Sequence, residues 1–209
     1  MFDYDKFIAG VRSCENYPDH NFHRRFRAMA EAVPAGSRVL DIACGAGTLM
    51  AALQDKGCKC VGIDLAPGAV TLAQSKGLDV HHGDVDAFEE DERIGKLLLA
   101  EYDVVIFSKC LMYLRNRNAL MRRLRSGHVL INQINPYYWR FWIGEFPGDY
   151  VGEYRAADGT AIAIQSPGAL MRWGASYGYQ ARRLEGGWLH GRDMVIALSK
   201  PERAAELRS

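Results

Sequence analysis

Residues Arg38 to Met50, which read RVLDIACGAGTLM, indicate how the chain folds. Residues 38–42 form a short aliphatic run that is typical of a buried strand. Small residues follow, and from Thr48 onward the apolar residues recur at helical spacing. A strand, a glycine turn and a helix, in this order, form the unit that binds nucleotides at the carboxyl edge of a parallel sheet.

The turn in this unit departs from the nicotinamide-binding pattern Gly-x-Gly-x-x-Gly. Met50 stands where the third glycine is expected, and a methionine there does not favour close packing of the helix on the strand. Asp41 precedes the glycines, and its charge would repel a pyrophosphate but accept a hydrogen bond from a cationic amine. The pattern therefore favours S-adenosyl-L-methionine, which has a sulfonium and an ammonium group and no phosphate, over NAD.

This stretch resembles motif I of the class I S-adenosylmethionine-dependent methyltransferases, usually Val-Leu-Asp-x-Gly-Cys-Gly-x-Gly. Ala43 replaces the first glycine, a small-for-small exchange that we expect to be tolerated. The resemblance covers roughly residues 38–200. It implies an α/β, Rossmann-like class I methyltransferase fold: a mostly parallel seven-stranded sheet with one antiparallel strand, helices on both faces, and an N-terminal helical cap.

The length and composition fit one globular domain with a full core, because 48% of the 209 residues are hydrophobic and 24% are charged. Within residues 1–209 we expect a helical cap over 1–36, a cofactor-binding half over 37–134, a substrate-side half over 135–200 and a polar tail over 201–209. Local patterns predict the following further elements. Strands are expected at 59–63, 78–82, 102–107, 127–134, 180–184 and 193–199, a hairpin at 150–165, and helices at 2–11, 22–32, 48–57, 69–75, 89–100, 119–125 and 167–177.

Several classes of partner are disfavoured by composition. A net charge of +1 gives no electrostatic reason to expect nucleic acid or a membrane surface, and no apolar run approaches the roughly 20 residues that span a bilayer. The five cysteines are expected to be free thiols in a reducing cytoplasm, because their number is odd and their spacing fits no zinc pattern. His81 and His82 are neighbours in a strand and point to opposite faces, so no metal site is predicted.

Acidic residues at two strand ends are the main candidates for cofactor binding. Asp64 follows the second strand, seventeen residues after Gly47, and its carboxylate can accept from both ribose hydroxyls. Its alternative role is to cap the helix that follows. The resemblance implies that Asp84 accepts from the adenine amine while the amide of Val85 donates to the ring, with Asp86 as an alternative cap. The complete predicted cofactor set is Asp41, Ala43, Cys44, Gly45, Gly47, Asp64, Leu65, Asp84, Val85 and Ser108.

Candidates for acceptor binding come from two other parts of the chain. The resemblance implies that the loop after the fourth strand faces the transferred methyl group, although Met112 and Tyr113 suit plain packing equally well. The segment 135–142 holds five aromatic residues, a spacing that fits neither a one-faced strand nor a helix stripe. The predicted acceptor-binding residues are Tyr17, Met112, Tyr113, Tyr137, Trp139 and Trp142. No residue stands out as a general base, and the candidates are His20, Tyr113 and Tyr137, with His23, His128 and His190 as further possibilities.

Two functions remain open on these grounds. The first is a methyltransferase that acts on an oxygen or nitrogen nucleophile of a small molecule by in-line displacement. The second follows from stretches 83–86, 102–111 and 135–140, which are similar to the MetW-like methionine-biosynthesis group. That similarity implies a cofactor-binding accessory subunit, which would use residues 137–142 as an interface with a partner enzyme or a second copy of the chain.

Overall fold

A computed structural model describes residues 24–134, 152–155, 161–185 and 193–203. The expected cap is described over helix α2 (Arg24–Ala32), while the aromatic segment 135–142 lies outside the described residues.

The centre of the molecule is a seven-stranded sheet in the order β3-β2-β1-β4-β5-β9-β8. Its strands are β1 (Arg38–Ile42), β2 (Lys59–Asp64), β3 (Val80–His82), β4 (Glu101–Ser108), β5 (Arg125–Ile134), β8 (Gln180–Glu185) and β9 (Asp193–Ser199). The pairs from β3 to β5 are all parallel, and β9 runs antiparallel to both of its neighbours. The predicted sheet, with one antiparallel strand, is confirmed.

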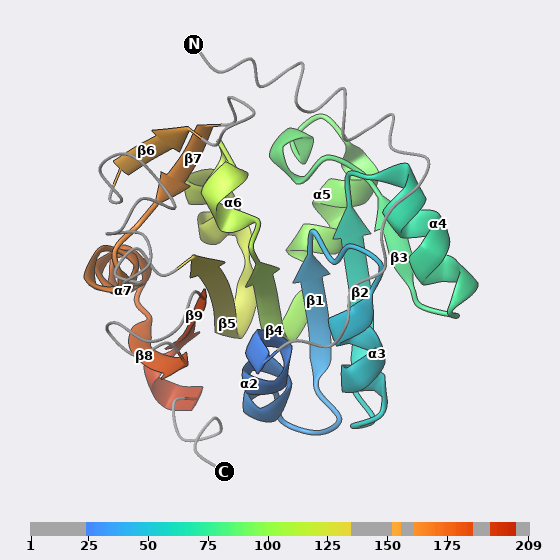
Figure 1. Cartoon of the computed structure of the whole chain (residues 1–209), viewed down its shortest axis with the longest axis horizontal. Coiled ribbons are helices and arrows are strands. Elements are labelled where there is room, and N and C mark those ends of the chain that lie inside the picture. The colour runs from blue at the N-terminus through green and yellow to red at the C-terminus, as the bar shows by residue number, and fades with distance from the viewer. Residues whose placement is uncertain (1–23, 135–151, 156–160, 186–192, 204–209) are drawn as a thin grey trace.

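Helices cover both faces of this sheet because its buried strands present apolar side chains alternately to the two sides. Val39 and Val104 belong to one hydrophobic cluster, and Leu40 and Val105 to the other. The first cluster is covered by α2, α3 (Thr48–Gln54) and α4 (Pro67–Ser75). The second is covered by α5 (Glu92–Leu99), α6 (Arg117–Arg123) and α7 (Pro167–Ala175) (Figure 1).

The hairpin predicted over 150–165 is present as a separate two-stranded antiparallel sheet. It consists of β6 (Gly152–Arg155) and β7 (Ala161–Ile164). Strand β7 lies against the short 3₁₀ helix η2 (Leu111–Tyr113), which follows β4. The hairpin therefore stands beside the loop predicted to face the methyl group.

The helix predicted over 89–100 is shorter in the structure and begins at Glu92. The reason is a cap, because the Asp91 carboxylate accepts hydrogen bonds from the amides of Arg93 and Ile94 and ends the preceding turn. Before it, Val85–Ala87 form the 3₁₀ helix η1, and Pro201–Arg203 form η4 at the other end of the chain. No helix within the described ranges is long and apolar enough to span a membrane.

The strand order reverses between β1 and β4, so the switch point of the sheet lies at the carboxyl ends of these two strands. From β1 the chain first proceeds outward to β2 and β3, and then returns to the other side to form β4 and β5. Ligands of open α/β sheets bind outside the strand ends where the order reverses in this way. In Figure 1 the arrowheads of β1, β2 and β4 all point to this edge.

Candidate functional site

The turn that follows β1 is held by backbone hydrogen bonds. The Cys44 amide donates to the Ile63 carbonyl at 3.2 Å, and the Gly47 amide donates back to the Cys44 carbonyl at 3.1 Å. Ala43, Gly45 and Gly47 all have positive φ angles, of 56°, 57° and 72°. This backbone shape explains why glycines recur here, because it is left-handed and glycine adopts it without strain.

Helix α3 packs closely on the sheet despite Met50. Its side chain is fully buried, and its sulfur lies 2.7 Å from the point that a β-carbon on Gly62 would occupy. The expectation that Met50 does not favour close packing of the helix on the strand is therefore wrong. A glycine on the neighbouring strand provides the room that the third glycine of a nicotinamide turn provides elsewhere.

Ala43 is strained, and its replacement by glycine is expected to stabilise the protein. An alanine in the left-handed region costs about 1–2 kcal/mol, part of which is offset because glycine loses more entropy on folding. We expect Ala43→Gly to raise the free energy of unfolding by about 0.5–1 kcal/mol in urea titrations. Gly57→Ala is the matched control, since Gly57 has φ 76° and no atom within 4 Å of an added β-carbon, so it should show the reverse effect. Destabilisation by Ala43→Gly would mean that packing of the Ala43 methyl group outweighs the backbone strain.

Asp41 is the most unusual charged group at this edge. Its side chain is 1% exposed, and its Oδ1 atom has no hydrogen-bond partner in the described part of the chain. Burial raises the pKa of Asp41 to about 8, and the nearby Asp64 carboxylate makes a second, smaller contribution in the same direction. A buried acceptor without a hydrogen bond is unfavourable unless a ligand donates to it. A cationic amine would donate to Asp41 Oδ1 and would also neutralise the ionised carboxylate.

Asp64 connects the ends of β1 and β2. Its Oδ2 accepts from the Gly45 amide at 2.7 Å and its Oδ1 from the Ala66 amide at 2.8 Å. Burial raises its pKa, although these two hydrogen bonds act in the opposite direction. The N-cap residue of α4 is Ala66, so Asp64 shapes the turn before the helix without being its cap. Each carboxylate oxygen has two lone pairs, which leaves acceptor capacity for ribose hydroxyls.

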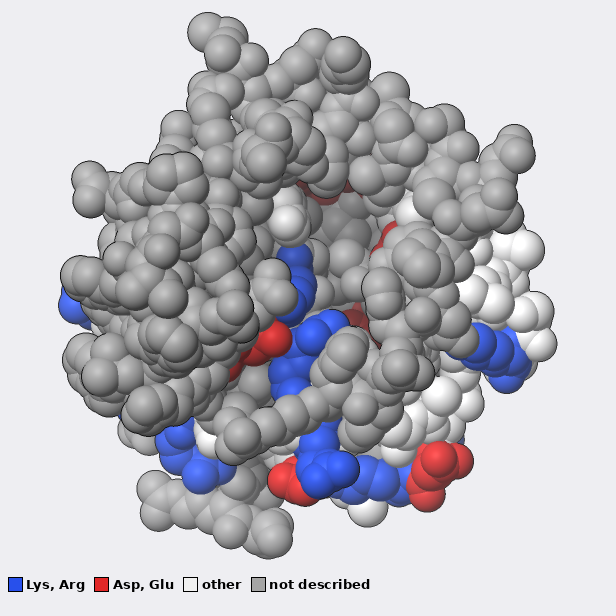
Figure 2. All heavy atoms as spheres, in the orientation of Figure 1, with Lys and Arg blue, Asp and Glu red and all other residues white. Residues whose placement is uncertain are grey.

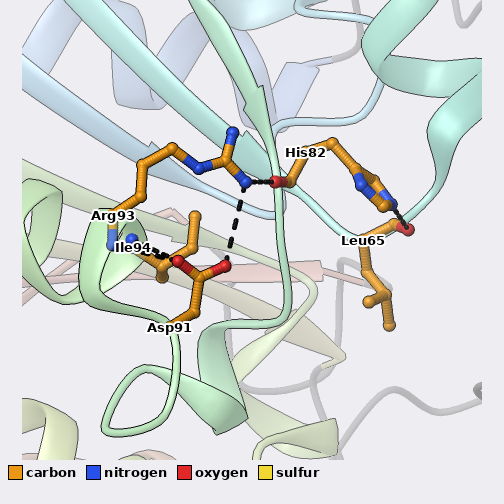
Figure 3. Close-up of polar contacts among 5 residues, drawn as sticks. All are labelled: Leu65, His82, Asp91, Arg93 and Ile94. Carbon is orange, nitrogen blue, oxygen red and sulfur yellow. Dashed lines mark hydrogen bonds and ion pairs between the residues drawn. The ribbon is translucent and has the colours of Figure 1, made fainter.

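A second set of contacts holds the loop after β2 in place (Figure 3). The Arg93 guanidinium donates to the His82 carbonyl at 2.5 Å and lies 3.8 Å from the Asp91 carboxylate. The His82 ring in turn contacts the carbonyl oxygen of Leu65 at 3.1 Å through Nε2. Leu65 is predicted to contact the cofactor, and contacts from His82 of β3 and Arg93 of α5 thus hold its backbone in place.

The two carboxylates after β3 have different roles. Asp84 accepts from the Asp86 amide at 2.9 Å and caps η1. Asp86 accepts from the amides of Arg115 and Asn116 at 3.1 and 2.9 Å, which joins this turn to the start of α6. The capping role that was expected as an alternative for Asp86 therefore belongs to Asp84, and Asp86 instead connects this turn to the loop before α6. Val85, between them, is buried.

Beside Ser108 of the predicted cofactor set, the ends of β4, β5 and β9 carry residues that sequence patterns did not single out. Ser108, at the end of β4, is in register with Asn132 on β5. The next residue, Lys109, has φ 58°, and its Nζ lies 2.8 Å from Asp193 Oδ1 at the start of β9. Arg25 of α2 lies 3.7 Å from the other oxygen of Asp193. Figure 2 shows basic and acidic atoms close together near the centre of the view, where the surface is hollowed. A polar residue near the carboxyl end of a buried strand was the available signal for Asn132.

The remaining candidates for acceptor binding and for a general base divide into three groups. Met112 is 4% exposed and Tyr113 is half-buried in η2, so both stay candidates beside the packing role. His128 is fully buried near the amino end of β5, and its ring contacts the Ser199 hydroxyl, which places it away from the carboxyl edge. The other candidates, Tyr17, His20, His23, Tyr137, Trp139, Trp142 and His190, lie outside the described residues.

With this geometry in hand, comparison with known proteins gives the family. The family model described as methionine biosynthesis protein MetW matches residues 23–144, more than half of the chain. This chain belongs to the MetW family. The matched range includes β1 to β5 and every described residue named above at the carboxyl edge of the sheet except Asp193. The predicted MetW-like resemblance is confirmed.

Curated relatives of this MetW-family chain carry two kinds of name. It is 27% identical over 158 residues to the ubiquinone biosynthesis O-methyltransferase of Leptothrix cholodnii, covering 72% of this chain and 67% of that one. Matches to two further proteins of that name cover 46% and 54% of their lengths, so the chain spans about half of them. It is also 30% identical over 148 residues to the bifunctional methionine biosynthesis protein MetXA/MetW of Rhodopirellula baltica, covering 61% of this chain and 22% of that one.

Solved structures share the fold of the MetW-family chain. One is the S-adenosylmethionine-dependent methyltransferase of Mesorhizobium loti, with a TM-score of 0.64 at 17% identity over 83% of this chain and 96% of that one. Another is the methyltransferase of Bacteroides fragilis in complex with S-adenosyl-L-homocysteine, with a TM-score of 0.61 at 22% identity over 84% and 76%. The predicted class I methyltransferase fold is confirmed.

Proposed function

We propose that this chain binds S-adenosyl-L-methionine and transfers its methyl group to an oxygen or nitrogen atom of a small molecule. The observation that supports this most is Asp41, a buried carboxylate with an unpartnered oxygen at the switch point of a methyltransferase fold. The relatives named as O-methyltransferases and the neighbour crystallised with S-adenosyl-L-homocysteine support the same activity.

The residues present fit this cofactor. Asp41 would accept from the amino group of its methionyl part, and Asp64 from the ribose hydroxyls, while Leu65 and Val85 flank the adenine side. When bound, the cofactor supplies an electrophilic methyl group for in-line displacement. The chain then contributes mainly position, since holding two reactants in line converts an encounter in solution into a reaction within one complex. The glycine turn allows the close approach that this binding requires.

The acceptor side is formed by the ends of β4, β5 and β9. Of the predicted acceptor-binding residues, Met112 and Tyr113 lie in η2, which follows β4, and Ser108 of the predicted cofactor set ends β4. The name of the O-methyltransferase relatives supports a hydroxyl group as the acceptor. A hydroxyl or an amine carries a proton that must leave during transfer, so the site must give that proton a route to solvent.

Binding of S-adenosyl-L-homocysteine is the expected result that tests this function. Isothermal calorimetry should show saturable binding of S-adenosyl-L-homocysteine to the purified chain and none of NAD, because Asp41 can pair with an amine, whereas an ionised pyrophosphate has no hydrogen to donate to it. Binding of NAD together with no response to S-adenosyl-L-homocysteine would refute the proposal. As a control, Asp55→Asn removes an exposed carboxylate at the end of helix α3, and this variant should bind S-adenosyl-L-homocysteine like the wild type.

A second candidate function is an accessory subunit of a biosynthetic enzyme. The supporting observation is the Rhodopirellula relative, in which a MetW part and a MetXA part share one chain. In that case the isolated chain would bind the cofactor without transferring its methyl group. A stoichiometric protein partner recovered from extract, together with no methyl transfer by the isolated chain, would favour this function over the first.

A further inference from the structure

Asn132 is a fully buried amide at the carboxyl end of β5. Its Nδ2 donates to the Met194 carbonyl of β9 at 3.0 Å. This bond fixes which way the amide faces, because a flipped group would place Oδ1 against the carbonyl oxygen of Met194. The position of Oδ1 is therefore set by β9.

The Oδ1 atom of Asn132 has no hydrogen-bond partner among the described residues. Folded proteins leave few buried acceptors unpaired, because such an atom gives up its hydrogen bonds to water and gains none in return. The nearby Gln133 is also a buried amide, and it has its partner, the Gln165 carbonyl, at 2.6 Å from Nε2. Both amides thus donate to a backbone carbonyl, but of the two only Asn132 has a buried oxygen that is without a partner among the described residues, and a ligand with an N–H or O–H group would supply that hydrogen bond.

The location of Asn132 fits the acceptor better than the cofactor. Strand β4 separates β5 from β1, so the end of β5 lies about 10 Å across the sheet from the strand that carries Asp41. Asp41 and Asp64 occupy the cofactor side, and Asn132 lies beyond Ser108 on the other side.

The backbone beside Asn132 is held in an uncommon shape. The Lys109 amide donates to the Asn132 carbonyl at 2.8 Å, and Lys109 itself has a left-handed φ of 58°. Its Nζ reaches Asp193 on β9, so contacts among three strand ends maintain this conformation. Strained residues of this type gather at ligand sites, where the surrounding structure holds them in place.

We infer that Asn132 binds the methyl acceptor, with Oδ1 accepting a hydrogen bond from the N–H or O–H group that is to be methylated. This inference rests on the proposed function. It sets the acceptor class as alcohols, phenols and amines, because an ionised carboxylate has no hydrogen to offer. Transfer forms a bond between the acceptor atom and the methyl carbon, breaks the carbon–sulfur bond with its electron pair left on sulfur, and releases the acceptor's proton to water.

The test compares Asn132→Ala with Gln133→Ala, its matched control. In the first measurement, protein loaded with S-adenosyl-L-homocysteine is incubated with a metabolite extract, and retained molecules are identified by mass spectrometry. In the second, methyl-tritiated S-adenosylmethionine is incubated with the same extract. We expect both variants to bind S-adenosyl-L-homocysteine like the wild type. Capture of the acceptor and labelled product should fall roughly 10- to 100-fold in Asn132→Ala and stay near the wild-type level in Gln133→Ala.

The outcomes separate this inference from the function on which it rests. Equal capture and transfer by the two variants overturns the role of Asn132. A labelled product that releases volatile methanol in base is a methyl ester, and it overturns the acceptor class with wild-type protein alone, even if Asn132→Ala does not fold. Wild-type protein that binds S-adenosyl-L-homocysteine but labels nothing overturns the inference and leaves cofactor binding intact. Absence of that binding overturns the proposed function itself.

Discussion

Asp41→Asn is expected to make the ligand-free protein more stable and to weaken binding of S-adenosylmethionine roughly 100-fold. The affinity falls because the substitution removes the charge that the cofactor's amine is expected to pair with, in a site closed to water. The stability rises because Asp41 is buried at 1% exposure with its Oδ1 unpartnered, so it must take up a proton when the chain folds at neutral pH, whereas an amide of the same shape is uncharged and takes up none. Calorimetry and thermal unfolding of the same preparation measure both effects.

The pH dependence gives this prediction a definite sign. Burial raises the pKa of Asp41 to about 8 in the folded protein, against an ordinary value of 3.8 for an aspartate exposed to water. Between these values the folded state holds the proton more tightly than the unfolded chain. The contribution of Asp41 to stability is therefore fully present near pH 4, is lost as pH rises toward 8, and changes no further above that. At neutral pH the difference between Asp41→Asn and wild type is on the order of a few kcal/mol, and it should vanish near pH 4.

Binding should reverse the protonation of Asp41. An ammonium group beside the carboxylate favours its ionised form, so binding to the wild type near neutral pH should release a proton to the buffer. In calorimetry this release makes the observed enthalpy depend on the buffer's ionisation enthalpy, and Asp41→Asn should lose that dependence. Asp55→Asn, which removes an exposed carboxylate, should keep it. A buffer-independent enthalpy for the wild type would contradict the assignment of Asp41 to the amine.

The cofactor half of the site was accessible to sequence reasoning because its signals are local. Asp41 and Asp64 each follow a run of buried aliphatic residues, and the carboxyl ends of parallel strands meet at one edge of a sheet. The glycines at 45 and 47 reflect a left-handed backbone that few other residues adopt. Each of these inferences needs only a few neighbouring residues.

The acceptor half depends on contacts between distant segments, which local patterns do not encode. Asp193 meets Lys109 because β9 inserts next to β5, and Arg25 joins them from α2. The unpartnered oxygen of Asn132 is visible once Met194 is known to hold the other end of the amide. The error over Met50 has the same origin, since the space for that side chain comes from Gly62 on the adjacent strand.

The second large effect is expected for Asp64→Ala, which should lower both stability and cofactor affinity. The carboxylate accepts from the Gly45 and Ala66 amides, so alanine leaves two buried donors without partners. Each such loss costs about 1–3 kcal/mol, and we expect the free energy of unfolding to fall by about 2–4 kcal/mol in total. Loss of the ribose acceptors should remove a further 1–3 kcal/mol, or roughly 5- to 150-fold, from cofactor affinity.

A variant elsewhere in the chain separates these two effects. Ser166→Ala removes the cap of α7, where the hydroxyl accepts from the Ala169 amide at 3.1 Å, and should cost about 1 kcal/mol of stability without changing affinity. Because the Asp64 charge also raises the pKa of Asp41, Asp64→Ala should shift the upper end of the pH-dependent stability change below about 8. If Asp64→Ala loses stability while binding S-adenosyl-L-homocysteine as tightly as Ser166→Ala does, the carboxylate serves to shape the turn, and the ribose must be bound by other residues.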